Sequence, residues 1–185
     1  FRTVEINNTF YNLPSEDTFR DWERRAPKGF CFVLKFSRYG THMKKLKDPA
    51  GTIGLFLERA ELLKEKLGPI LVQLPPHWGA DPERLSAFLD VAPSKHRWAV
   101  EVRDSSWLCE EVYAVLEEHG AALCIHDLIE NHPQRVTADW VYLRFHGAGD
   151  GGDYPYQALS ASARRIEQHV DAGRDVFAYF NNDAH

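Results

Sequence analysis

Short apolar runs alternate along the chain with longer segments in which apolar residues recur every three or four positions. The short runs are typical of strands, and the longer period is typical of amphipathic helices. The runs predict seven strands, at residues 3–7, 30–36, 70–74, 98–103, 121–126, 140–146 and 175–181. The periodic segments predict five helices, at residues 15–26, 49–67, 82–92, 109–119 and 158–172.

Local signals at the ends of these segments support the prediction. Asp48-Pro49 and Asp81-Pro82 each place a capping side chain before a proline at the first helical position. A glycine stands between a helix and the next strand four times, at Gly29, Gly68, Gly120 and Gly173. A left-handed glycine commonly ends a helix at such a place. The repeated order of helix, glycine and strand predicts an α/β fold with parallel strands.

The order and number of elements favour a barrel. We expect residues 1–185 to form one domain, a (β/α)8 TIM-type barrel that lacks about one βα unit, because such a barrel has eight strands. Residues 127–139 are too short and too interrupted by proline for a full crossover helix, so they are expected to be an irregular link. An open doubly wound sheet is the alternative, but it usually shows a glycine-rich turn after its first strand, and none occurs here.

Alternate residues of the strands differ in polarity. Val100 and Val102, for example, alternate with Glu101 and Arg103. Because strand side chains point to opposite faces in turn, the apolar set should lie under the helices and the polar set should point into the barrel. The polar set gathers toward the carboxyl ends of the strands, where barrels of this kind place active sites. Any single member could instead belong to an ion pair that only stabilises the interior.

The polar set supplies the candidate site residues. The candidate catalytic residues, as general acids or bases, are Glu5, Glu101 and His146. The candidate substrate-binding residues are Asn7, Tyr11, Lys35, His42, Gln73, Arg103, Trp107, Arg144 and Asn181. Within this group Lys35, Arg103 and Arg144 would hold an anion, since arginine binds phosphate or carboxylate through two parallel hydrogen bonds.

Charge and composition restrict the class of protein. The formal net charge of −5 and the sequence pI of about 6.0 argue against a general nucleic-acid binder. The basic run 38–47 nevertheless keeps a nucleic-acid-binding module open as an alternative. No apolar run approaches the roughly 20 residues of a membrane helix.

The three cysteines, Cys31, Cys109 and Cys124, are odd in number and form no C-x-x-C pair. We therefore expect reduced thiols and a cytoplasmic location, with Cys31 and Cys124 buried. No cofactor is predicted and no metal-binding spacing occurs. A divalent metal held by Glu5, Glu101, His126 and His146 stays possible.

Several motifs together suggest a family. They are VEINNTFY at 4–11, QLPP at 73–76, VEVR at 100–103 with Ser106 and Trp107, LRFHG at 143–147 and YFNN at 179–182. In this order along the whole chain they resemble the YecE-like proteins, also called domain of unknown function 72. The resemblance implies a TIM-type barrel whose first strand and last helix lie outside this sequence. Members often have a histidine where this chain has Asp104. The family has no established activity.

The leading functional hypothesis is an enzyme that acts on a small anionic substrate bearing phosphate or carboxylate. A hydrolase, a lyase and an isomerase all remain open as reaction classes. One alternative is a metal-dependent enzyme of sugar or phosphoester chemistry, and the other is the nucleic-acid-binding module that uses residues 38–47. No membrane partner is expected, and the sequence leaves the oligomeric state open.

Overall fold

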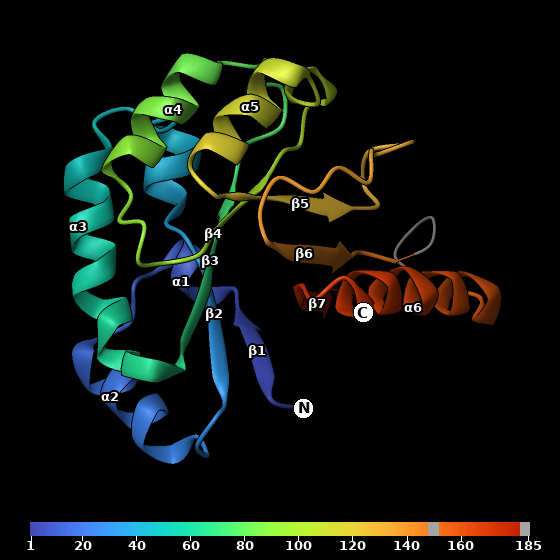
Figure 1. The fold of residues 1–185 in the computed structure, drawn as a ribbon. Coiled ribbons are helices and arrows are strands. Elements are labelled where there is room, and N and C mark those ends of the chain that lie inside the picture. Colours follow the sequence, from blue (N-terminus) through green and yellow to red (C-terminus); the bar gives the residue numbers. More distant parts are fainter. Residues whose placement is uncertain (148–151, 182–185) are drawn as a thin grey trace.

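Seven parallel strands follow one another in chain order around a nearly closed barrel in the computed structural model, which describes residues 1–147 and 152–181 (Figure 1). Every neighbouring pair of strands is parallel. The strands are β1 (Thr3–Ile6), β2 (Cys31–Lys35), β3 (Leu67–Gln73), β4 (Trp98–Glu101), β5 (Ala122–His126), β6 (Trp140–Phe145) and β7 (Asp175–Phe180). The structure confirms the α/β TIM-type fold.

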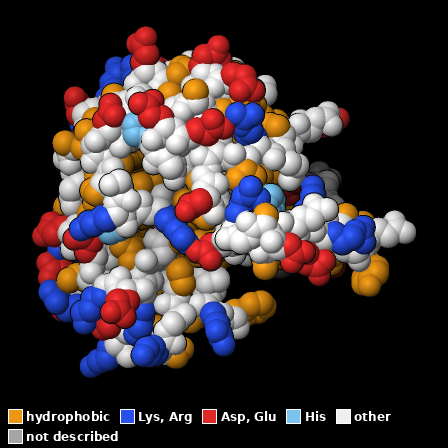
Figure 2. All heavy atoms as spheres, viewed as in Figure 1, with side chains coloured by type: hydrophobic (Ala, Val, Ile, Leu, Met, Phe, Trp, Pro, Cys, Tyr) orange, Lys and Arg blue, Asp and Glu red, His pale blue; other side chains and the backbone are white. Residues whose placement is uncertain are grey.

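Helices connect the strands, except β5 and β6, and cover them from outside. They are α1 (Asn8–Tyr11), α2 (Glu16–Arg25), α3 (Pro49–Ala60), α4 (Pro82–Val91), α5 (Glu110–Glu118) and α6 (Tyr156–Asp171). Three further segments complete the described elements: a wider π-helical turn at Tyr39–Met43 and tighter 3-10 segments at Glu61–Lys66 and Ser105–Trp107. Figure 2 shows positive and negative side chains interspersed over the outer surface of these helices. No helix in the described ranges is long and apolar enough to span a membrane.

The barrel is open between β1 and β7, and side chains bridge the opening. Thr3 Oγ1 and the Tyr179 hydroxyl lie 2.7 Å apart in one hydrogen bond. Asn7 Nδ2 donates to Asn181 Oδ1 at 3.1 Å. These contacts bring the first and last strands together although they share no backbone ladder.

The two faces of the strands have the polarity expected. Val100 and Val102 are buried in the large outer core with Phe56 and Phe88 of the covering helices. On the inner face, apolar residues occupy the amino-terminal half: Val33 precedes Lys35 by two positions, for instance, and belongs to a separate inner cluster. The barrel is therefore packed with apolar side chains toward the amino ends and holds its polar side chains toward the carboxyl ends.

The helix ends agree with the prediction at most positions. Asp81 caps α4 by accepting from the Arg84 amide at 3.1 Å. Asp48 precedes Pro49 as expected but makes no capping bond, because its backbone is left-handed (φ 46°) and its carboxylate faces Lys44 Nζ at 3.6 Å. The helix predicted to reach residue 67 ends at Ala60 and continues as a 3-10 segment.

Three of the four glycines are left-handed, and two of them, Gly120 and Gly173, directly follow a helix C-cap as predicted, whereas Gly29 lies in a turn three residues after the C-cap Ala26 of α2. Gly29, Gly120 and Gly173 have φ values of 79°, 61° and 76°. The prediction is wrong for Gly68, which lies inside β3. A Cβ atom at Gly68 would lie 2.2 Å from Cys31 Sγ on the neighbouring strand, so close packing and not a left-handed backbone requires glycine there.

This contact gives a stability prediction. Gly68→Ala should lower the free energy of unfolding by about 1–3 kcal/mol, because the added methyl overpacks the contact with Cys31. Gly54→Ala is the matched control: it lies in α3 with open space around its Cβ position, so it should stabilise by about 0.5–1 kcal/mol. Urea unfolding of both variants measures the difference. Equal effects would show that the Cys31 contact has no energetic consequence.

All three thiols are free. Cys124 is buried, as predicted, but Cys31 is only half-buried because it is the first residue of β2, at the end of the barrel away from the polar side chains. The irregular link between β5 and β6 is confirmed, since residues 127–139 contain no helix.

Candidate functional site

The carboxyl ends of the strands bring together a ring of charged and polar side chains. The ring consists of Glu5 on β1, Lys35 on β2, Gln73 on β3, Glu101 and Arg103 at the end of β4, and Arg144 on β6. The register of the sheet accounts for the meeting: Gln73 lies opposite Glu101 on the next strand. Because all six residues share one strand face, barrel closure points them at a common interior.

Arg144 links the two carboxylates of this ring. Its Nη2 donates to Glu5 Oε1 at 2.7 Å, and its Nη1 donates to Glu101 Oε2 at 2.5 Å. The Tyr142 hydroxyl donates to the other oxygen of Glu5 at 2.5 Å. The Arg144 side chain is completely buried. A buried charge is tolerated only when it is paired in this way.

Arg103 completes the coordination of Glu101. Its Nε donates to Glu101 Oε1, and its Nη2 donates to Gln73 Oε1 at 3.2 Å. Burial alone raises the pKa of Glu101, but the charges of Arg144 and Arg103 outweigh burial and lower the pKa to about 2. Burial lowers the pKa of Arg144, and the two carboxylates reverse this and hold it above its ordinary value. Glu101 and Arg144 are therefore both charged near neutral pH.

Lys35 differs from the arginines of the ring. The side chain is buried, and its Nζ lies 4.2 Å from the centroid of the Phe10 ring. Within the residues that the structure describes, its ammonium makes no ion pair and no hydrogen bond. Burial lowers the pKa of Lys35 to about 8, and the nearby charge of Arg144 contributes to the shift. Lys35 is thus a cation with no hydrogen-bond acceptor for its ammonium among the described residues.

His42 also contacts Phe10. The two rings meet edge-on, with their centroids 5.0 Å apart. The Thr41 hydroxyl donates to the Ser37 carbonyl at 3.0 Å, so Thr41 accepts from His42 Nδ1 at 2.9 Å. This contact assigns the proton to Nδ1 and leaves a lone pair on Nε2. Burial, with the charge of Lys35, lowers the pKa of His42 to about 4, so the imidazole is neutral.

Two more histidines, His126 and His146, lie beside the ring and differ in their hydrogen bonding. His126 uses both nitrogens: Nε2 donates to the Val102 carbonyl at 2.8 Å, and Nδ1 accepts from the Leu128 amide at 3.2 Å. His146 has a buried Nε2 with no hydrogen-bond partner among the described residues. Burial lowers the pKa of both histidines, to about 4 for His126. His126 therefore fixes the end of β5, whereas His146 has a nitrogen available for other contacts.

A metal site among these groups is not indicated. The described ranges contain no group of three or more histidine, cysteine, aspartate or glutamate side chains placed to hold a metal ion. Of the four residues considered from the sequence, His126 has no free nitrogen and Glu101 is already bound by two arginines. Residues present here thus do not fit a divalent metal held by that set.

The remaining sequence candidates occupy three different places. Asn7 and Asn181 pair with each other across the opening of the barrel. Tyr11 is exposed and meets Phe10 edge-on at 4.9 Å between centroids. Trp107 does not reach the ring: it is fully buried in the outer core and donates from Nε1 to the Trp78 carbonyl at 2.5 Å.

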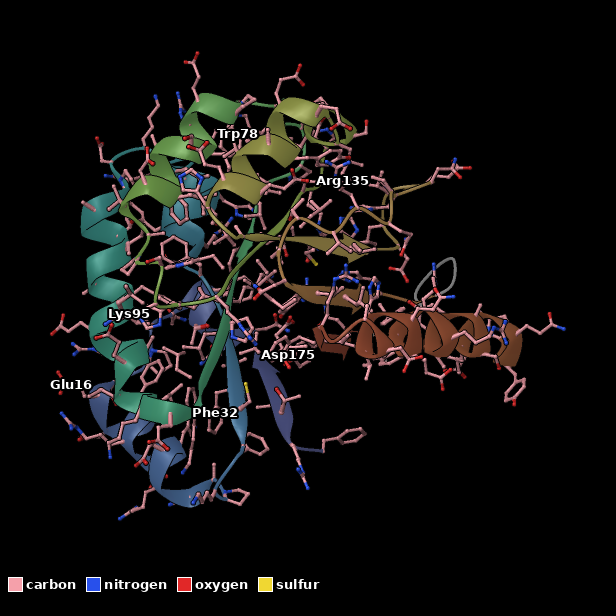
Figure 3. All side chains as sticks on the ribbon, in the orientation of Figure 1. Glu16, Phe32, Trp78, Lys95, Arg135 and Asp175 are labelled. Carbon is pink, nitrogen blue, oxygen red and sulfur yellow. The ribbon has the colours of Figure 1, made fainter. Side chains whose placement is uncertain are left out.

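Trp107 instead packs edge-on against Trp78, which is labelled in Figure 3, at 4.9 Å between ring centroids, and both rings belong to the outer core. Two neighbours of the ring, Phe10 and Tyr142, were not predicted from the sequence. Phe10 lies in the short helix α1, where the strand alternation no longer applies. Tyr142 is two positions before Arg144 on the same strand face, so the alternation alone could have found it.

One cavity, with a volume of about 260 Å³, reaches this group of residues from the side of the irregular link. His126 and Arg144 form part of its wall, together with residues of 127–134 and with Ser162, Arg165 and His169 of α6. The cavity lies between the irregular link and α6, and residues of β5 and β6 form the rest of its wall. Its wall includes neither Lys35 nor Arg103.

The comparisons with known proteins agree with the fold and with the resemblance seen in the motifs. The family model described as protein of unknown function DUF72 matches residues 1–185. A crystal structure of a DUF72 family protein from Thermotoga maritima MSB8 shares 28% identity with a TM-score of 0.87, over 99% of this chain and 78% of that one. A second, from Enterococcus faecalis V583, shares 22% identity with a TM-score of 0.81, over 99% of this chain and 83% of that one, and supports the fold alone. No curated protein matches the sequence.

Proposed function

The chain belongs to the DUF72 family of proteins of unknown function, and on that premise we propose that it is an enzyme that binds a small anionic substrate at the carboxyl ends of its strands. The substrate bears a phosphate or a carboxylate. The observation that carries the proposal is the imbalance of the ring, in which Lys35, Arg103 and Arg144 face only Glu5 and Glu101 among the described residues. Within residues 1–147 and 152–181 one positive charge of the ring is therefore left over, and it resides on Lys35.

Two of the cations have donors to offer a ligand. Lys35 has all three ammonium protons uncommitted within the described ranges. Arg103 uses Nε and Nη2, which leaves Nη1, and a quarter of its side chain is exposed. Charge-assisted hydrogen bonds are shorter and stronger than neutral ones, and low dielectric strengthens them further. Arg144, in contrast, already donates hydrogen bonds to both Glu5 and Glu101, so it stabilises the arrangement of the site.

The roles of the acids and histidines follow from their protonation. Glu101 stays ionised between two arginines, so it orients Arg103 and Arg144 and does not donate a proton near neutral pH. His146 and His42 are neutral, and His42 carries its lone pair on Nε2. A neutral imidazole within reach of a bound substrate can accept and return a proton. We assign proton transfer to His146, with His42 beside Lys35 as the second base.

Anion binding can be tested with Arg103→Ala. Isothermal titration with phosphate and with a small carboxylate should show binding to the unaltered protein and a loss of affinity of about 10- to 100-fold or more in the variant, because a charged hydrogen bond is removed. The variant should stay folded, at a cost of about 1–3 kcal/mol from the orphaned partners of Arg103.

Arg97→Ala is the matched control for this titration. Arg97 immediately precedes β4, whereas Arg103 follows it, and its guanidinium pairs with Asp175 at 2.7 Å at the other end of the barrel. Its anion affinity should equal that of the unaltered protein. An unchanged affinity in Arg103→Ala, or the same loss in both variants, would contradict the proposed site.

A further inference from the structure

Lys35 has the surroundings of a reactive amine. Its backbone is fixed, since the Thr9 hydroxyl donates to the Lys35 carbonyl at 2.8 Å. Its side chain is buried against Phe10, which gives the amine an apolar neighbour. The charged groups around it are Glu5 and Glu101, whose oxygens are already bound by arginine and tyrosine, and the cations Arg103 and Arg144. His42, the remaining titratable neighbour, is neutral.

Lys66 shows what an ordinary part-buried lysine looks like in the same protein. Its Nζ donates to the carbonyls of Glu23 and, at 2.8 Å, of Ala26, and it lies 3.8 Å from the Glu23 carboxylate. Three fixed acceptors thus surround that ammonium. Lys35 lacks such acceptors among the described residues and lies beside two arginines, a combination that is known to activate lysine as a nucleophile.

We propose that Lys35 attacks a carbonyl group of the anionic substrate and forms an imine with it. The lone pair of the unprotonated Nζ forms a bond to the carbonyl carbon, and the carbonyl π electrons pass to oxygen. Both hydrogens of the amine end on that oxygen, which leaves as water, while nitrogen and carbon become doubly bonded. The step needs no oxidant or reductant. It rests on the proposed function, because the anion site is what brings the carbonyl to Lys35, and it restricts the substrate class to carbonyl compounds with a phosphate or carboxylate.

The protonation of Lys35 supports this chemistry. Its pKa of about 8 leaves a substantial fraction of the amine unprotonated at neutral pH. A lysine with the ordinary pKa near 10.5 has roughly 200-fold less free amine at pH 7.5. A carbonyl carbon that reaches Lys35 therefore meets a nucleophile that surface lysines do not provide.

Reductive trapping tests the proposal on the whole protein. Pyruvate and dihydroxyacetone phosphate serve as probes, with sodium cyanoborohydride to reduce any imine to a stable secondary amine. Peptide mass mapping should place the adduct on Lys35, formed about tenfold faster than on the exposed Lys28, with a rate that rises through a midpoint near pH 8. Lys66 should remain unmodified.

Two variants separate charge from nucleophilicity. Lys35→Arg keeps the cation but removes the nucleophilic amine, so it should lose trapping at position 35. Lys66→Arg should trap at Lys35 as fast as the unaltered protein. Circular dichroism confirms that each variant is folded. Adducts spread evenly over exposed lysines, or trapping at Lys35 no faster than at Lys28, would overturn the proposal.

Further ligands separate this inference from the proposed function. Lactate and glycerol 3-phosphate carry the same anions without the carbonyl, so they should bind and should slow the trapping of pyruvate and dihydroxyacetone phosphate. If these two anions bind but no imine is trapped, the imine is refuted and the anion site stands. If neutral dihydroxyacetone modifies Lys35 as fast as its phosphate does, the anion site is refuted and the inference fails with it.

Discussion

Replacing Arg144 with methionine is expected to lower the free energy of unfolding by about 3–5 kcal/mol. Arg144 is completely buried between Glu5 and Glu101, at 2.7 and 2.5 Å. Methionine fills a similar volume but leaves two carboxylates without their shared cation, and an uncompensated buried charge is far more costly than a lost surface pair. Chemical denaturation at pH 7 measures the loss.

The pH dependence of this variant provides a second readout. Arg144 lowers the pKa of Glu101, whereas burial raises it. Without Arg144 the effect of burial is opposed by fewer charges, so the pKa of Glu101 in the folded variant rises. If it rises above the unfolded value of 4.5, the protonated form stabilises the variant below that pH, and stability falls as pH increases. Arg135→Met is the control: Arg135 pairs with Glu117 on the surface (Figure 3), and its unfolding midpoint should barely change. Similar losses in the two variants would contradict the structural role of Arg144.

Acid should remove the stabilisation that Glu101 provides. Its pKa is lowered from 4.5 in the unfolded chain to about 2 in the folded protein. A lowered pKa means that the contribution, about 3 kcal/mol, is present above pH 4.5 and is lost as the pH falls through 2. Glu101→Gln lacks this contribution at every pH. The stability difference between the unaltered protein and the variant should therefore be largest near neutral pH and shrink toward pH 2.

Urea unfolding of both proteins between pH 7 and pH 2.5 measures this difference. Glu110→Gln serves as the control, because the Glu110 side chain is 78% exposed and should change stability little at any pH. A difference between Glu101→Gln and the unaltered protein that stays constant down to pH 2.5 would show that Glu101 is not held ionised by its arginines.

The sequence predicts much of the barrel and of the ring because one regularity governs both. Strand side chains alternate in direction, so Glu5, Lys35, Glu101 and Arg144 could be assigned to one interior from their positions in apolar runs. Parallel strands in chain order then bring these ends together without further information. Asp81 likewise caps its helix through a bond between near neighbours in the chain.

The features that could not be predicted depend on contacts between distant segments. Alternation places Arg103 and Arg144 in the ring, but only the three-dimensional distances show that both bind Glu101 and that Lys35 does not. Trp107 follows a strand after its alternation has ended, so its direction toward the outer core was open. Gly68 is required by a contact with Cys31 on another strand, which no local pattern records.

A crystal structure of the protein grown with phosphate tests whether Lys35 and Arg103 form an anion site. We expect one phosphate at the carboxyl ends of the strands, with oxygens about 2.7–3.2 Å from Lys35 Nζ and from the Nη1 atom of Arg103. Arg144 should remain bound to Glu5 and Glu101 in that structure. Water alone at this position under saturating phosphate, with Lys35 paired to Glu5 or Glu101, would contradict the account and would leave the ring as a purely structural ion network.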